Sequence, residues 1–261
     1  MIVVKFGGHA MKDENGYFAK AISSALATGE KVVVVHGGGP QIDAALKAKQ
    51  ISSEWIGGFR VTTQEIFDVV EEVLVNHVGH EVAATLAKSG IKAKAISARA
   101  LPTVIAKRRT TLIDGTPADL GFVGEVQSVN PAQLLELIGQ GFVPVVAPVS
   151  SDEDLKTGLN VNADFAAASI AAALEASQLI VMTDVAGIYR NWPDKTTLIE
   201  LISASDLESI KAGFAEGMAP KVQAALDALS YGAQAVRIID GTDPDSFASA
   251  LAGTGGTVVV A

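Results

Sequence analysis

Short runs of β-branched and other apolar residues alternate with helical patterns along most of the chain, and this alternation limits the fold more than any other feature. The runs occupy residues 2–6, 31–35, 93–97, 142–147, 179–183, 235–239 and 257–260. Several are apolar throughout, as expected for central strands that are covered on both faces. Because helices separate most of the runs, the pattern predicts an α/β fold with βαβ crossovers and a mainly parallel sheet.

One helical pattern is much longer than the others, and one stretch of the chain departs from the alternation of strands and helices. In residues 64–88, apolar positions recur at mixed spacings of three and four, which predicts a single long amphipathic helix. Residues 103–129 read instead as strand, turn at 114–117 and strand again near 122–126, which indicates a β-hairpin on the flank of the sheet. The remaining helices are expected at 16–27, 40–49, 131–139, 161–176, 205–213 and 219–231.

Composition excludes several classes of function. The net charge of -9 argues against a nucleic-acid surface, because such surfaces need clustered Lys and Arg in excess. Since the chain has no cysteine, disulfides, thiolate metal sites and a thiol nucleophile are excluded. The apolar runs are well below the roughly 20 residues that span a bilayer, and Lys5 interrupts the first of them. We therefore expect no membrane span, no signal peptide and a cytoplasmic location.

Two glycine-rich junctions follow the first two predicted strands. Lys5-Phe6-Gly7-Gly8 ends the first, and VVVVHGGGPQID at 32–43 joins the second to a helix that begins near Pro40. Such junctions direct backbone N–H groups and a helix dipole at an anion, although tight turns and packing account for most glycine-rich turns. Neither junction matches the P-loop or G-x-G-x-x-G spacing, so a nucleotide site here is of another kind.

Two later motifs place charged residues at helix starts. Asn160-Val161-Asn162-Ala163-Asp164 precedes an alanine-rich helix, where helix capping is the simpler interpretation. Alternatively, the Asp164 carboxylate holds lysine side chains. Lys221, in GMAPK at 217–221, lies at a helix start where a cation opposes the helix dipole, which favours a functional role.

The histidines offer little chemistry. His77 and His80 lie three residues apart without a carboxylate partner, which makes a poor metal site, so we predict no protein metal ligand. His9 and His36 adjoin the glycine junctions, where strand-end packing accounts for them at least as well as ligand contact does. The residues assemble into no Ser-His-Asp arrangement.

Seven motifs together resemble the amino acid kinase family, in order and over nearly the whole chain. They are KFGGHAM (5–11), VVVVHGGGPQID (32–43), GGFRVT (57–62), DLGFVGEV (119–126), NVNAD (160–164), TDVAGIY (183–189) and GMAPK (217–221). The resemblance is strongest to the branch of the family that phosphorylates the side-chain carboxylate of N-acetyl-L-glutamate with ATP in arginine biosynthesis. It implies an open three-layer αβα sandwich, with an acceptor lobe at about 1–175 and an ATP lobe at about 176–261.

The resemblance also implies a role for each motif. Lys5 and Lys221 would stabilise the transferring phosphoryl group, Asp164 would hold both lysines, and the N–H groups of Gly8 and Gly38 would add hydrogen bonds. Gly37, Gly38, Arg60 and Asn160 would bind the acceptor. The nucleotide site would contain Lys5, Thr183, Asp184, Gly187, Tyr189, Met218 and Lys221. Magnesium would arrive on the ATP phosphates, and the long helix at 64–88 would form a homodimer.

Two departures from the family pattern leave alternatives open. Ala98-Arg99-Ala100-Leu101 stands where close relatives carry a turn with glycine and aspartate, so a related kinase acting on an acetylaminoadipate-type acceptor remains an alternative. An alternative from a different class is a non-catalytic nucleotide or amino-acid sensor with the same fold, which the presence of Lys5, Asp164 and Lys221 disfavours. The chain also starts directly with its first strand, whereas arginine-inhibited hexameric members carry an extra N-terminal helix. We therefore expect weak or no arginine feedback.

Overall fold

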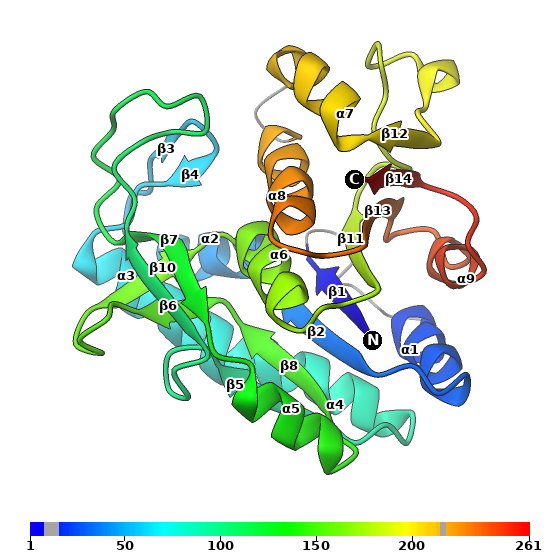
Figure 1. The fold of residues 1–261 in the computed structure, drawn as a ribbon. Coiled ribbons are helices and arrows are strands. Elements are labelled where there is room, and N and C mark those ends of the chain that lie inside the picture. The colour runs from blue at the N-terminus through cyan, green and yellow to red at the C-terminus, as the bar shows by residue number, and fades with distance from the viewer. Residues whose placement is uncertain (8–15, 215–217) are drawn as a thin grey trace.

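A twisted sheet of eight strands organises the molecule, in the order β12-β14-β13-β11-β1-β2-β8-β5 (Figure 1). The computed structural model describes residues 1–7, 16–214 and 218–261. The strands are β1 (Ile2–Phe6), β2 (Val32–His36), β5 (Ala93–Ser97), β8 (Val143–Ala147), β11 (Gln178–Thr183), β12 (Leu201–Ser203), β13 (Ala235–Asp240) and β14 (Thr257–Val260). All neighbouring pairs are parallel except β13 and β14. The predicted mainly parallel sheet is confirmed.

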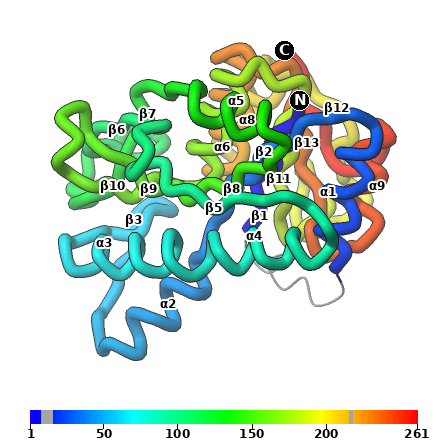
Figure 2. Tube along the Cα trace, turned by 90° about the horizontal axis from the view of Figure 1, so that it is seen from below, coloured from blue at the N-terminus to red at the C-terminus, as the bar shows by residue number. Residues whose placement is uncertain are grey.

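Helices cover both faces of this sheet. One layer contains α1 (Tyr17–Ala27), α2 (Gly39–Ala48), α3 (Gln64–Glu71), α4 (Gly79–Lys88) and α9 (Ser246–Leu251), and the other contains α5 (Ala132–Gly139), α6 (Ala163–Ala173), α7 (Ala204–Ile210) and α8 (Ala219–Ser230). Figure 2 shows α4 and α5 on opposite sides of β5 and β8. Strand residues alternate between the two cores, with Val4 and Phe6 facing α1 and Val3 facing α6. This is the three-layer αβα arrangement.

The long helix predicted at 64–88 is continuous but not uniform. Between α3 and α4, residues Glu72–Val78 form π-helical turns. This wider segment packs against the junction between β2 and α2, since a Cβ atom at Gly38 would lie 2.5 Å from Cδ2 of Leu74. A period of three and four residues does not distinguish α-helical from π-helical turns, which is why the pattern predicted a single helix.

The hairpin predicted within 103–129 is present, but it belongs to a second sheet. Strands β6 (Val104–Arg108) and β7 (Val123–Val129) pair antiparallel and close into a ring with β9 (Val149–Ser151) and β10 (Gly158–Val161). Beside this ring, β3 (Trp55–Ile56) and β4 (Phe59–Arg60) form a small hairpin. The strands missed from sequence span two to four residues, too short for a periodic signal.

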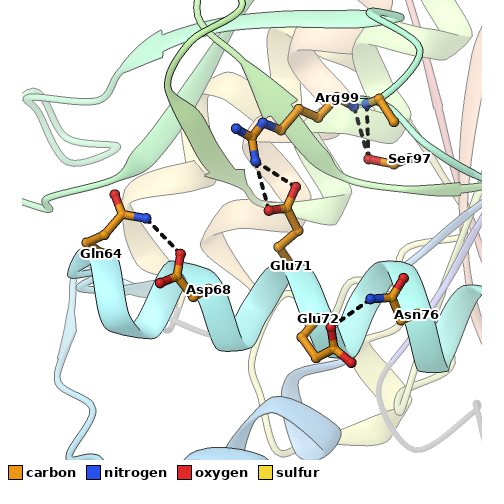
Figure 3. A network of polar contacts seen from close by, with 8 residues as sticks. Gln64, Asp68, Glu71, Glu72, Asn76, Ser97 and Arg99 are labelled. Carbon is orange, nitrogen blue, oxygen red and sulfur yellow. Dashed lines mark hydrogen bonds and ion pairs between the residues drawn. The ribbon is translucent and has the colours of Figure 1, made fainter.

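The turn at Ala98–Leu101, which departs from the family pattern, is fixed to α3. Nη1 of Arg99 lies 2.8 Å from both carboxylate oxygens of Glu71, and the Ser97 hydroxyl accepts hydrogen bonds from the N–H groups of Arg99 and Ala100 (Figure 3). The same view shows side-chain hydrogen bonds along the exposed face of the long helix. Among the described helices, none is long and apolar enough to cross a lipid bilayer.

Candidate active site

Two lysines and one aspartate meet at the carboxyl edge of the sheet. Nζ of Lys5 lies 3.1 Å from Oδ1 of Asp164, and Nζ of Lys221 lies 3.1 Å from Oδ2 of the same carboxylate. The Asp164 side chain is 5% exposed, whereas that of Lys221 is 19% exposed. The sequence had placed these residues in three separate motifs, and the fold brings them together.

Local structure explains how each of the three side chains is aimed. On β1, Lys5 shares its face with Val3, which packs against α6, so the strand alternation points Lys5 at the start of that helix. The side chain of Asn162 caps α6 by accepting a hydrogen bond from the N–H of Asp164 at 2.8 Å. Capping and lysine binding therefore fall to different residues, and both interpretations of NVNAD hold. Lys221 lies in the first turn of α8, where the Asp164 carboxylate offsets the unfavourable dipole.

Within this cluster, the two lysines keep the Asp164 carboxylate ionised. Burial by itself would raise the pKa of Asp164, but the charges of Lys5 and Lys221, together with the hydrogen bond that Lys221 donates, outweigh burial and hold that pKa at about 2. Burial lowers the pKa of Lys5, and the Asp164 charge opposes this shift. Two cations that share one carboxylate leave a net positive charge, which suits an anionic ligand.

Glycines leave space for an anion beside this cluster. A Cβ atom at Gly7 would lie 3.0 Å from Nζ of Lys5, so the absence of a side chain keeps room around the ammonium group. Gly37 hydrogen-bonds through its N–H to the carbonyl of Phe6 at 2.8 Å, which joins the two glycine junctions. Helix α2 starts after Gly38 without a side-chain cap, leaving backbone N–H groups available to a ligand. Gly8 and His9 lie outside the described residues.

A cavity of about 310 Å³, here called the Arg60 cavity, opens on one side of the cluster. The predicted acceptor residues Gly37, Gly38, Arg60 and Asn160 all line it, together with Lys5, Asp164 and Lys221. In the described part of the chain, the turn at Ala98–Leu101 lies outside this lining.

Arg60 is held in place with one nitrogen atom free. Its Nη1 lies 2.8 Å from Oδ1 of Asp43 and donates to the Ser53 hydroxyl at 2.7 Å, while the guanidinium stacks 4.5 Å from the centre of the Trp55 ring. Its Nη2 is buried and has no partner among the described residues. A buried, unpaired guanidinium nitrogen is costly unless a ligand binds it, which favours a carboxylate in this cavity.

Asn160 approaches the same cavity from β10. Its amide Nδ2 donates to the Thr62 hydroxyl at 3.1 Å, and that hydroxyl donates to the carbonyl of Arg60 at 2.7 Å. These bonds fix the direction of the amide, so its oxygen is available as an acceptor.

A second cavity of about 650 Å³, here called the Thr183 cavity, opens on the other side of the cluster. Of the predicted nucleotide residues, Lys5, Thr183, Asp184, Tyr189, Met218 and Lys221 line it. Gly187 does not, because it packs against Thr257, and a Cβ atom there would lie 2.4 Å from Oγ1 of Thr257. Lys5 and Lys221 line both cavities.

Both tryptophans lie in these linings, one in each cavity, and motif reading missed them. Trp55 lines the Arg60 cavity and is 55% exposed, and Trp192 lines the Thr183 cavity and is 59% exposed. Each is close in sequence to a motif, GGFRVT in the first case and TDVAGIY in the second. Tryptophan residues beside motifs of this kind were the signal available in the sequence.

His36 is a packing residue. Its side chain is fully buried at the end of β2, and its Nδ1 lies 2.9 Å from the carbonyl of Gly37. Burial lowers the pKa of His36 to about 4, against a smaller opposing effect of that hydrogen bond. The ring is therefore neutral near pH 7.

Comparison with known proteins identifies the family. The model of the amino acid kinase family matches residues 1–240. The chain belongs to the amino acid kinase family. This confirms the resemblance that the seven motifs indicated, over nearly the whole chain.

Individual relatives agree with this family assignment. The acetylglutamate kinase of Nocardia farcinica is 44% identical over 246 residues, which cover 94% of this chain and 81% of the relative. Among solved structures, smu.665 from Streptococcus mutans UA159 has a TM-score of 0.83 at 28% identity, covering 99% of this chain and 98% of that one. Carbamate kinase from Giardia lamblia bound to AMP-PNP has a TM-score of 0.71 at 19% identity, covering 99% and 97%. The predicted amino acid kinase fold is confirmed.

Proposed function

We propose that this protein transfers the γ-phosphoryl group of ATP to the side-chain carboxylate of N-acetyl-L-glutamate, a step of arginine biosynthesis. The observation that carries the proposal is the pair of cavities on either side of Lys5 and Lys221, which line both. An acceptor in one cavity and a nucleotide in the other would meet at these two cations. The acetylglutamate kinase of Nocardia farcinica, 44% identical to this chain, supports the choice of acceptor.

The Arg60 cavity suits an N-acetylated amino acid. The free Nη2 of Arg60 would bind the α-carboxylate, and Asn160 would bind the acetamido group, whose N–H can donate to the amide oxygen. This arrangement leaves the side-chain carboxylate directed at Lys5 and the Gly37-Gly38 junction. The acceptor lobe at about 1–175 and the nucleotide lobe at about 176–261 belong to the same proposal.

The chemical step needs no general base. The acceptor carboxylate is ionised at neutral pH, so an oxygen atom attacks the γ-phosphorus directly while the bond to the ADP oxygen breaks. An acyl phosphate and ADP are the products. Lys5 and Lys221 would neutralise charge on the equatorial oxygens, with the N–H groups of Gly38 and Gly8 assisting, and Asp164 would fix both lysines.

Magnesium enters this proposal on the nucleotide. Among the described residues, no three His, Cys, Asp or Glu side chains gather into a metal site. When bound, the ion reduces the charge of the phosphate oxygens and favours their approach to the acceptor. Asp184, exposed at the end of β11 in the Thr183 cavity, lies on the nucleotide side of the lysines.

The alternatives differ in what they leave unexplained. A non-catalytic sensor does not need two lysines on one buried carboxylate between two cavities, and the similarity to a kinase further disfavours it. The similarity to the acetylglutamate kinase of Nocardia farcinica also disfavours an acceptor that is one methylene longer. A binding pocket discriminates between two substrates that differ by one methylene by only about 1 to 3 kcal/mol. The homodimer through residues 64–88 and the cytoplasmic location stay predictions.

The two tryptophans allow each cavity to be tested separately, because the chain has no others. In a Trp55→Phe variant, a non-hydrolysable ATP analogue with magnesium is expected to change the fluorescence of Trp192 to saturation. In a Trp192→Phe variant, N-acetyl-L-glutamate is expected to change the fluorescence of Trp55. The reason is that Trp192 lines the cavity assigned to the nucleotide and Trp55 lines the cavity assigned to the acceptor.

Tryptophan amide titrated with the same ligands corrects for absorption by the nucleotide. The assignment of the cavities is contradicted if the acceptor changes only Trp192 and the nucleotide analogue changes only Trp55.

A further inference from the structure

Arg109 lies between the elements that carry the proposed site residues, although it lines neither cavity in the described part of the chain. It follows β6 and is anchored by its N–H, which donates to the carbonyl of Val123 at 2.8 Å. Its Nε donates to the carbonyl of Thr111 at 2.9 Å, which fixes the guanidinium plane.

The guanidinium of Arg109 packs against two aromatic rings. Its Cζ lies 4.7 Å from the centre of the Phe59 ring and 5.4 Å from that of Phe165, and the two rings are nearly parallel with centres 6.2 Å apart. A cation against two aromatic rings is attracted to both, more strongly where water is excluded. Phe59 is 3% exposed, so this contact is sheltered.

The two rings are the chain neighbours of the proposed site residues. Phe59 precedes Arg60 on β4, and Phe165 follows Asp164 on α6. The distance between the guanidinium of Arg60 and the carboxylate of Asp164 therefore depends on how their neighbours Phe59 and Phe165 pack against each other. Arg109 contacts both of those rings.

Arg109 also lies within range of carboxylate charges on β7 and on α8, the helix that carries Lys221. Burial lowers the pKa of Arg109, and the charges of Glu125 on β7 and Asp227 on α8 oppose that shift. Asp227 accepts a hydrogen bond from Nε2 of Gln223 at 2.8 Å on the same helix. Carboxylates on β7 and α8 therefore both favour the charged form of Arg109, whose guanidinium contacts rings on β4 and α6.

We propose that Arg109 is a positioning residue for phosphoryl transfer, which sets the acceptor-binding Arg60 against the Lys5–Asp164–Lys221 cluster through Phe59 and Phe165. The inference rests on the proposed roles of these site residues. It requires no contact between Arg109 and either substrate. Loss of the guanidinium would let the hairpin of β3 and β4 shift relative to α6, and small errors in the alignment of reacting groups are costly.

An Arg109→Met variant tests this, because methionine keeps apolar contact with the rings but not the planar cation. Its kcat/KM for N-acetyl-L-glutamate is expected to fall by about tenfold or more, well within the hundredfold that a misplacement of about 1 Å can cost. Its KM for MgATP is expected to change by less than about twofold, because Arg109 is adjacent to the acceptor hairpin. An Arg109→Lys variant, which keeps the charge but not the planar fork, is expected to recover only part of the loss.

Arg108→Met is the matched control. Arg108 also stacks on a phenylalanine, at 4.2 Å from the centre of the Phe122 ring, but its side chain is exposed. Within the part of the chain that the structure describes, Phe122 meets the proposed site only through its backbone, whose carbonyl accepts a hydrogen bond from the N–H of Asn160 at 2.8 Å, and the Arg108 substitution leaves that bond in place. This control is expected to keep the activity of the unaltered protein.

A double variant separates positioning from general stability. If Arg109 acts through Phe59, then Phe59→Leu together with Arg109→Met should lose little more than either change alone. The proposal would be overturned if the losses in kcat/KM of the two single variants added up in the double variant. It would also be overturned if kcat/KM fell equally for both substrates and in proportion to a loss of thermal stability. An inactive unaltered protein would contradict the proposed function itself, whereas an active one with a normal Arg109→Met variant overturns only the positioning role.

Discussion

Replacing Lys221 with alanine is expected to lower turnover by about a hundredfold or more, and replacing Lys5 is expected to do the same. Each ammonium group lies 3.1 Å from Asp164 at the junction of the two cavities. Removing one leaves roughly a unit of transition-state charge unmatched in a sheltered cleft, which by analogy with an oxyanion donor costs about 3 kcal/mol. Steady-state kinetics with saturating MgATP and acceptor measure the loss in kcat.

The control for both variants is Lys47→Ala, because Lys47 is an exposed lysine in the last turn of α2 and lines neither the Arg60 cavity nor the Thr183 cavity. It should leave turnover unchanged. Near-normal turnover in either Lys5→Ala or Lys221→Ala would remove the catalytic role from that lysine.

Replacing Asp164 with asparagine is expected to destabilise the fold by about 3 to 5 kcal/mol, because two cations would lose their shared carboxylate in a buried site. The effect should depend on pH. The pKa of Asp164 in the folded protein, about 2, is below its ordinary value of 3.8, so the carboxylate stabilises the fold above about pH 4. That contribution, roughly 2 kcal/mol from the pKa difference, is lost as the pH falls towards 2. Urea unfolding of both proteins across this range measures it.

Asp206→Asn is the matched control, since Asp206 also lies in the first turn of a helix but is exposed. It should cost little at any pH. The role of Asp164 is contradicted if the unaltered protein and Asp164→Asn differ by the same free energy of unfolding at pH 7 and at pH 2.

Much of the central sheet could be predicted from sequence because its strands are continuous apolar runs. Val32 to Val35 and Val143 to Ala147 are buried on both sides, and short continuous apolar runs are typical of strands that helices cover on both faces. The four-stranded ring was harder to predict, because β9 and β10 are short and joined by a polar loop. Their pairing with β6 and β7 depends on contacts that no local pattern contains.

The candidate site shows the same division. Lys5, Asp164 and Lys221 could be selected because each has an unusual position, on a buried strand or at a helix start. The partners of Arg60 could not, because Asp43, Ser53 and Trp55 reach it from different elements. Gly187 belongs to a recognisable motif, yet its position is explained by packing on Thr257. Motif resemblance therefore selected the residues of the candidate site, whereas geometry showed which side chains line the two cavities.

Trapping of the product with hydroxylamine tests the central claim most directly. Hydroxylamine converts an acyl phosphate into a stable hydroxamate, so the purified protein with MgATP can be compared on N-acetyl-L-glutamate, its homologue one carbon longer, and glutamate. The account predicts hydroxamate from N-acetyl-L-glutamate far above the other two. Preference for the longer acceptor would contradict the assigned substrate, and no hydroxamate from any of the three would contradict phosphoryl transfer to a carboxylate.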